Sequence, residues 1–244
     1  MIDEDPDLLG GLDGTLADAV RHQLIARTLS LELRAWEPLG NDLPPDFDGW
    51  LGLLVLDGLL VRQVDIGGLR CCELLGPGDV LRPWDEDGPG AALESQSCWR
   101  VLEPTRLALL DAAFARRASR WPSVTAELMR RTLARSRSLS ILLALTQARR
   151  ADVRLRTLFW HLADRWGRVT PGGVVLPLNL THRVIAELTG LRRPSVSLSL
   201  GELERTGEIV RLSKSQWLIA HPEEHRAASA GRAARGDGPA ALIR

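Results

Sequence analysis

The sequence predicts an α+β protein built from an antiparallel β-domain, a long helix and a C-terminal winged helix-turn-helix. Short apolar runs separated by Gly, Pro and Asp turns fill much of the first half of the chain, as is typical of antiparallel strands. Residues 123–148 contain neither Gly nor Pro, as an uninterrupted helix requires. Two short amphipathic patterns on either side of Gly190 precede a hairpin pattern, which indicates the third part.

The N-terminal segment is acidic and then becomes helical. Residues 1–15 are rich in Asp and Gly, so we expect a flexible tail. From Leu16 to about Leu29 the apolar residues recur at helical spacing, which predicts a helix that opens a domain spanning residues 16–121.

The β-domain is expected to be a small antiparallel barrel or sandwich. Residues 49–56 and 59–64 are apolar runs on either side of Asp57-Gly58, a dipeptide that favours a two-residue hairpin turn. Further runs at 69–75, 80–81, 98–102 and 107–110 are separated by turn residues. A short helix is expected over residues 111–120.

The long helix is assigned to residues 122–150, with Ser123 as its N-cap. Its apolar residues fall near a heptad seam, a pattern that usually pairs with another helix. We therefore expect dimerisation through this seam, while packing of the helix along its own domain is the alternative. The expected dimerisation residues are Leu128, Thr132, Arg135, Leu139, Leu142 and Thr146.

Residues 151–222 are expected to form the winged domain, and residues 223–244, rich in Ala, Gly and Arg, a disordered tail. The expected elements are a helix from Asp152 to Trp166, a turn at 170–173, a strand at 174–178, the two helices of the motif, and wing strands at 208–212 and 216–220.

The stretch "THRVIAELTGLRRPSVSLSLGELERTG" carries the functional signal. Thr181 is placed to cap the first helix, and Ala186 is small enough for a close helix crossing. Gly190 can adopt the left-handed turn between the helices, and Val196 would fill the core between them. Pro194 suits the first turn of the second helix.

The second helix would expose a face suited to a duplex groove. On a wheel of about 100° per residue, Val196, Leu200 and Leu203 share one side, and Pro194 and Leu198 lie opposite. Arginine reads phosphates or guanine edges, serine reads bases or phosphates, and leucine contacts thymine methyl groups. Lys214, the only lysine, would lie at the wing tip. The expected DNA-binding residues are Thr181, His182, Arg192, Arg193, Pro194, Ser195, Ser197, Leu198 and Lys214.

Charge is distributed unevenly along a chain of zero net charge. Residues 1–112 hold 8 arginines against 21 acidic residues, a net −13, and residues 113–244 hold 23 basic against 10 acidic residues, a net +13. This asymmetry indicates an anionic partner such as double-stranded DNA for the second half. Mutual neutralisation of the two halves is the alternative, and a winged module used only for protein contacts is another.

Other classes of protein are disfavoured. Cys71, Cys72 and Cys98 lack disulfide-framework or metal-site spacing, so we expect buried, inert thiols, with redox or metal use as the alternative. No histidine lies within the expected β-domain strands, and no nucleophile motif, P-loop or dinucleotide fingerprint occurs, so we expect no enzyme, metal or cofactor. The acidic N-terminus and the absence of a long apolar run indicate a cytoplasmic protein without membrane contact.

The order of these parts resembles the Crp/Fnr family of bacterial transcription regulators over about residues 20–220. "GLLVLDGLLVRQV" and "ELLGPGDVL" are similar to the family's cyclic-nucleotide-binding-like β-roll, and "ADVRLRTLFWHLADRWG" with "VVLPLNLTHRVIAELTGLRRPSVSLSLGELERTGEIV" to its DNA-binding domain. The resemblance implies a homodimeric regulator that binds a two-fold-related operator, with RNA polymerase as a further candidate partner. A non-DNA-binding adaptor built on the same fold is the alternative.

This sequence also departs from the family's pattern at several motif positions. The family's base-reading positions fall on Arg193, Pro194, Ser197 and Leu198. Of these Arg193 matches a family arginine, whereas Pro194 and Leu198 replace residues that are often glutamate and arginine. After Gly78-Asp79 the family's Gly-Glu and its phosphate-gripping Arg-Ser or Arg-Thr pair are missing, and Asp85, Glu86 and Asp87 follow Arg82. We therefore expect a degenerate sensor that does not bind cAMP, with any effector unknown.

Overall fold

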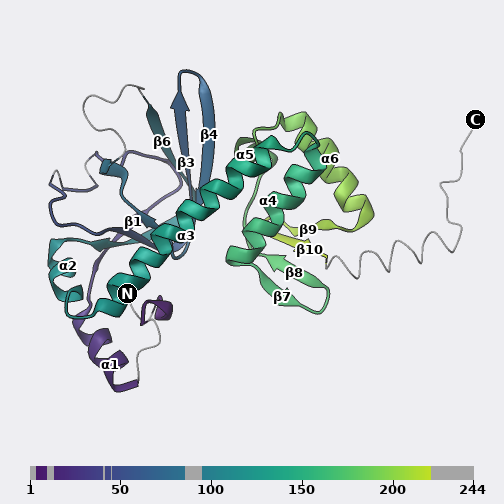
Figure 1. Ribbon diagram of the computed structural model, residues 1–244. Helices are drawn as coiled ribbons and strands as arrows, with labels where there is room; N and C mark the ends of the chain where they lie inside the picture. The colour runs from purple at the N-terminus through teal and green to yellow at the C-terminus, as the bar shows by residue number, and fades with distance from the viewer. Residues whose placement is uncertain (1–3, 10–13, 41, 45, 86–94, 221–244) are drawn as a thin grey trace, which may run out of the picture. The chain divides into compact units, whose positions relative to one another are not determined.

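The computed structural model describes residues 4–9, 14–40, 42–44, 46–85 and 95–220, and the chain divides into two compact units, residues 1–140 and 141–244 (Figure 1). The first unit holds η1 (Pro6–Leu9), α1 (Gly14–Gln23), β1 (Arg27–Leu31), β2 (Ala35–Trp36), β3 (Gly52–Ile66), β4 (Leu69–Leu75), β5 (Val80–Leu81), η2 (Pro83–Asp85), β6 (Gln96–Leu110), α2 (Ala112–Ala118) and most of α3 (Pro122–Gln147). The second holds the end of α3, then α4 (Ala151–Trp166), β7 (Arg168–Thr170), β8 (Gly173–Leu176), α5 (His182–Thr189), α6 (Arg193–Thr206), β9 (Ile209–Ser213) and β10 (Gln216–Ile219).

A six-stranded antiparallel sheet organises the first unit. Its order is β1-β6-β3-β4, with β2 paired to β6 and β5 to β3. The two longest strands, β3 and β6, pair from Gly52↔Leu110 to Asp65↔Gln96. The residues expected as two strands at 98–102 and 107–110 therefore belong to one strand.

The predicted hairpin at Asp57-Gly58 is wrong, because β3 continues through both residues. Here the register against β6 shifts, and Gly58 has φ +91°. A Cβ on Gly58 would lie 2.4 Å from the carbonyl oxygen of Pro104. The Thr105 hydroxyl accepts the Leu59 N–H at 3.1 Å. The dipeptide is thus an irregularity that lets two strands approach closely, which is the usual role of glycine at a bulge.

The true hairpin turn lies ten residues farther on. Gly67 and Gly68 have φ +58° and +87°, as a type I′ turn requires. The Gly68 N–H donates to the Asp65 carboxylate at 2.8 Å. This turn connects β3 to β4.

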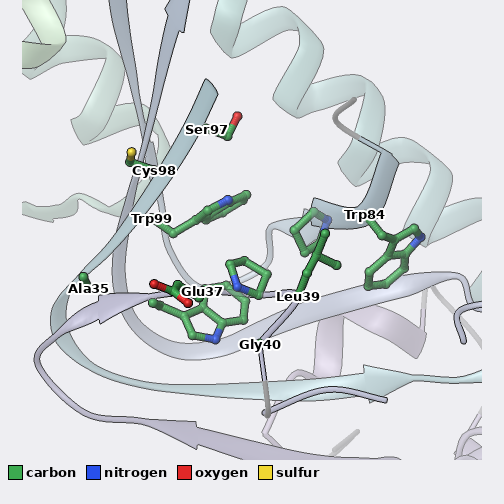
Figure 2. A pocket seen from close by; sticks show the side chains of 11 residues that line it. Ala35, Glu37, Leu39, Gly40, Trp84, Ser97, Cys98 and Trp99 are labelled. Atoms are coloured by element: carbon green, nitrogen blue, oxygen red, sulfur yellow. The ribbon is translucent and has the colours of Figure 1, made fainter. Parts of the chain in front are cut away.

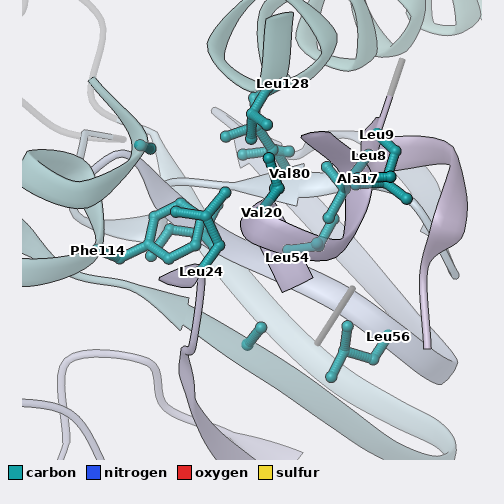
Figure 3. Packing of buried hydrophobic residues seen from close by; sticks show 14 residues of the cluster. Leu8, Leu9, Ala17, Val20, Leu24, Leu54, Leu56, Val80, Phe114 and Leu128 are labelled. Carbon is teal, nitrogen blue, oxygen red and sulfur yellow. The ribbon is translucent and has the colours of Figure 1, made fainter. Parts of the chain in front are cut away.

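The buried core also includes part of the segment expected to be a loose tail (Figure 3). Leu8 and Leu9 are buried against α1 and α3 residues such as Val20 and Leu128, and Asp5 forms an ion pair with Arg131 of α3. The expectation of a flexible segment is therefore wrong for residues 5–9, because burial of Leu8 and Leu9 stabilises the segment and Asp5 is paired with Arg131. Residues 1–3 and 10–13 lie outside the described part of the chain.

Two further expectations need correction in this unit. The helix expected to reach about Leu29 ends at Gln23, and β1 begins at Arg27. Of the three cysteines only Cys72 is buried, while Cys71 and Cys98 are exposed. Neighbouring strand residues point to opposite faces of a sheet, which explains why Cys71 and Cys72 differ.

The helix α3 begins at Pro122 rather than after an N-cap at Ser123. Proline is favourable at this first position because its missing N–H has no helical partner there. One face of α3 is buried and includes Val124, Leu128, Glu127 and Arg131. The opposite face of the helix is therefore the one that can contact another molecule.

The second unit has its own small sheet, ordered β7-β8-β10-β9. Its core contains Phe159 of α4 against Trp217 of β10, with ring centroids 5.0 Å apart. Sequence patterns gave a turn and one strand at 170–178, whereas the structure forms a hairpin from β7 and β8. The wing strands β9 and β10 agree with the expected ones to within one residue at each end. The expected tail at 223–244 lies outside the described residues.

Candidate nucleic-acid interface

The first helix of the motif, α5, is defined by its two ends. Thr181 is extended, and its hydroxyl accepts the Val184 N–H at 3.3 Å. At the other end Gly190 has φ +65° and ψ +19°, a left-handed geometry that glycine adopts at little cost. The Leu191 N–H returns to the Ala186 carbonyl at 3.2 Å. The chain therefore turns sharply into α6, as the sequence predicted.

The second helix, α6, is anchored by Val196, Leu200 and Leu203, all of which are buried. Arg192 is its N-cap but makes no side-chain capping bond, and Pro194 lies in the first turn. This anchoring leaves Leu198 at the centre of the outer face, 72% exposed.

The start of α6 brings together six of the predicted DNA-binding residues. Arg192, Arg193, Pro194, Ser197 and Leu198 are exposed, and Ser195 is half-buried. Within the described part of the chain, no carboxylate lies within ion-pair distance of Arg192 or Arg193. By contrast, Arg183 is paired with Glu187 and Arg205 with Glu202.

The other three predicted residues occupy different positions. The Thr181 hydroxyl is used for capping. His182 is the first residue of α5, and its Nδ1 lies 2.8 Å from the Ser197 hydroxyl oxygen. Sequence reasoning named both residues but not their contact, because two helices separated by a turn can face each other in several ways.

Lys214 is exposed in the turn between β9 and β10. The Arg211 side chain stabilises this turn, because it donates to the carbonyls of Ser213 and Lys214, both at 3.1 Å. It also lies over the Trp217 ring, 5.0 Å from its centroid. Arg211 was missed by sequence reasoning, although its position two residues before the turn of a basic hairpin is a usable signal.

In the first unit, a cavity of about 320 Å³ lies beside α3 and is lined by Arg62, Val80, Arg82, Asp85, Thr132 and Arg135. Its arginines already have carboxylate partners. Arg135 donates twice to buried Glu73, at 2.7 and 2.8 Å, and Arg82 is paired with Asp85. Arg82 also donates to the Trp50 carbonyl at 2.6 Å.

A larger cavity, about 530 Å³, lies at β2, η2 and β6 (Figure 2). Trp36, Trp84, Trp99 and Leu39 give it much apolar surface, and Glu37 is the one carboxylate among its described lining residues. Within the described residues no group of three His, Cys, Asp or Glu side chains is arranged to hold a metal.

The predicted dimerisation residues share one strip of α3 on the helical wheel but differ in exposure. Leu128, only 6% exposed, packs into the core of its own unit, and Arg135 is bound to Glu73. Leu142 and Thr146 are half-buried. The side chains of Leu128 and Arg135 are thus already in contact with their own unit.

Thr132 and Leu139 of the same strip are exposed. The exposed apolar residues of α3 outside the predicted set are Met129 (60% exposed), Leu133 (60%) and Leu143 (67%). Both faces of α3 carry leucines, so hydrophobic spacing could not show which face was already covered.

Comparison with known proteins agrees with this architecture. Residues 153–224 match the family model for the Crp-like helix-turn-helix domain. The chain is 32% identical over 160 residues to the regulatory protein CysR of Synechococcus elongatus (strain ATCC 33912 / PCC 7942 / FACHB-805), covering 64% of this chain and 69% of that protein.

Solved structures show the same fold at lower identity. A CooA mutant from Carboxydothermus hydrogenoformans is similar with a TM-score of 0.60 at 16% identity, covering 91% of this chain and 94% of that one. FixK2 from Bradyrhizobium japonicum gives 0.59 at 20% identity, covering 84% and 97%. None of the described helices is long and apolar enough to cross a membrane.

Proposed function

The chain belongs to the Crp/Fnr family of DNA-binding transcription regulators, and from that premise we propose that it acts as a homodimer on a two-fold-related operator, with a sensor domain that does not bind cAMP. The family is one of regulators rather than enzymes. RNA polymerase is a further proposed partner, supported only by this membership.

The observation that carries operator recognition is the start of α6. Arg192 and Arg193 are exposed and have no carboxylate partner among the described residues, although the arginines of nearby exposed positions do. Unpaired guanidinium groups at the start of a helix can reach phosphates or guanine edges in the major groove. The hydroxyls of Ser195 and Ser197 and the side chain of Leu198 extend the same face.

The exposed face of α3 supports the homodimer. Met129, Leu133 and Leu143 point away from the residues that pack into the sheet domain, and Ser136 and Ser140 lie between them on the helical wheel. Their spacing is close to the 3.5-residue repeat of paired helices. A second copy of α3 would cover apolar surface that otherwise faces water.

The cavity beside α3 supports the degenerate sensor. A cyclic nucleotide would need cations free to bind its phosphate. Here the Glu73 carboxylate accepts from Nε and Nη2 of Arg135, the Val80 carbonyl accepts from its Nη1, and Arg82 is paired with Asp85. A phosphate would therefore have to displace carboxylates that are already well bonded.

The test is a comparison of two double variants by fluorescence anisotropy on an operator selected from random duplexes. Replacing Arg192 and Arg193 with alanine should weaken binding by at least about 30-fold, and should lower the salt dependence by about two charges. Replacing Arg149 and Arg168 removes equal charge from exposed positions of the same unit and should change the affinity by only about threefold.

Two outcomes would contradict the proposal. Equal losses in both double variants would show nonspecific attraction rather than readout by α6. Absence of salt-dependent DNA affinity in the unaltered protein would instead favour the adaptor alternative.

A further inference from the structure

The contact between His182 and Ser197 has a consequence for base selection. The two residues lie on different helices of the motif, and the Nδ1–Oγ distance of 2.8 Å is that of a good hydrogen bond. A serine hydroxyl can donate or accept, so serine alone reads bases ambiguously. Once the hydroxyl donates its one proton to a neighbouring side chain, it can act toward DNA only as a hydrogen-bond acceptor.

His182 can accept this proton in a hydrogen bond at Nδ1. It is the first residue of α5, where helix-turn-helix proteins place the first helix across the DNA backbone. Thr181 uses its hydroxyl for Val184, which leaves other first-turn N–H groups free to face a phosphate. In the proposed complex a neutral imidazole would donate to a phosphate through an N–H on Nε2, because Nδ1 faces the Ser197 hydroxyl.

With the proton on Nε2, Nδ1 of the neutral ring is an acceptor. The Ser197 hydroxyl must then donate to Nδ1, and its oxygen can only accept from the DNA. The groups that donate in the major groove are the amino groups of adenine (N6) and cytosine (N4).

We infer that His182 is a specificity-determining residue that makes Ser197 an acceptor, so that Ser197 selects adenine or cytosine over guanine or thymine at one position of each half-site. The inference rests on the proposed binding of α6 in the groove. It assigns to His182 a positioning role on Ser197 in addition to a phosphate contact.

The experiment measures relative affinities for all four bases at each half-site position, using the full chain and competing duplexes. The unaltered protein should prefer adenine or cytosine at one position by about fivefold, the value of one directed hydrogen bond. Ser197→Ala should abolish this preference. His182→Ala should reduce it to about twofold or less while Ser197 is still present, because the freed hydroxyl then donates as readily as it accepts.

A double variant and a matched control separate positioning from general binding. His182→Ala combined with Ser197→Ala should show the same base profile as Ser197→Ala alone. Arg183→Ala removes a charge from the next residue of α5 and should weaken binding to all sequences about equally, with the profile unchanged.

The outcomes distinguish this inference from the function on which it rests. If the unaltered protein selects no operator, the proposed function fails and the inference falls with it. If it selects an operator but His182→Ala leaves the base profile unchanged, the inference alone is wrong. A preference for guanine or thymine that depends on Ser197 would also overturn it, because the hydroxyl would then be donating to the DNA.

Discussion

Replacing Leu133 with alanine should weaken the proposed homodimer without unfolding either copy. Leu133 is 60% exposed on α3. Complete burial of a leucine side chain is worth about 1.5–3 kcal/mol, so burial of three-fifths of it contributes about 1–2 kcal/mol. The contact occurs twice in a two-fold dimer. The loss is therefore about 2–4 kcal/mol, or roughly 30- to 700-fold in the dimer dissociation constant.

Sedimentation equilibrium over a range of protein concentrations measures this constant directly. The matched control is Leu128→Ala, five residues earlier on the same helix but 6% exposed and packed into its own unit. It should lower the free energy of unfolding by about 2–5 kcal/mol and leave the dimer constant of the folded protein within about threefold. Circular dichroism checks that both variants are folded.

The reverse pattern would refute the reasoning. If Leu128→Ala weakened the dimer and Leu133→Ala did not, the face of α3 that pairs would be the one that sequence spacing predicted, and the packing of Leu128 against its own unit would not describe the protein in solution.

Three further predictions concern stability in urea denaturation. Gly58→Ala should lower the free energy of unfolding by about 3 kcal/mol or more, because its Cβ would meet the Pro104 carbonyl. Gly68→Ala should lower it less, since a Cβ there meets nothing within 4 Å. Equal losses in the two variants would contradict this. Glu73→Ala should lower the free energy of unfolding by about 3–5 kcal/mol, because Arg135 loses its buried carboxylate partner. An unchanged urea midpoint would disprove this prediction. Burial, followed by the charge of Arg165, lowers the pKa of the His161 imidazole. The unfolded chain thus binds the proton more readily, so stability should fall as pH drops below about 6.5, and His161→Leu should remove part of that dependence; an identical pH profile in the variant would count against it.

The sequence by itself was sufficient for the order of the parts and for the helix-turn-helix. Gly190, Pro194 and Val196 act over a few residues, through a left-handed turn, a preset helix start and a buried contact. Such local signals have the same meaning in most surroundings, which is why these residues lie where the pattern predicted.

Local sequence signals gave a wrong prediction where one residue pattern is compatible with two backbone structures. Asp57-Gly58 suits a tight turn, but it also suits a bulge that lets Thr105 and Pro104 approach β3. The pairing of β3 with β6 over most of their length decides between the two, and around Asp57-Gly58 the partner residues lie 44 to 49 positions away in the sequence, from Leu59↔Glu103 to Asp57↔Arg106. The same holds for Leu8 and Leu9, whose burial depends on α1 and α3.

The tertiary structure alone decided which side of α3 is exposed and that His182 contacts Ser197. Leucines lie on both sides of α3, so only the packing of Val124 and Leu128 against their own unit shows that Met129, Leu133 and Leu143 remain exposed. His182 and Ser197 are fifteen residues apart, and only the crossing of α5 and α6 brings Nδ1 to the hydroxyl. A sequence pattern specifies the conformation of neighbouring residues, whereas the pairing of distant side chains is set by how completed elements pack.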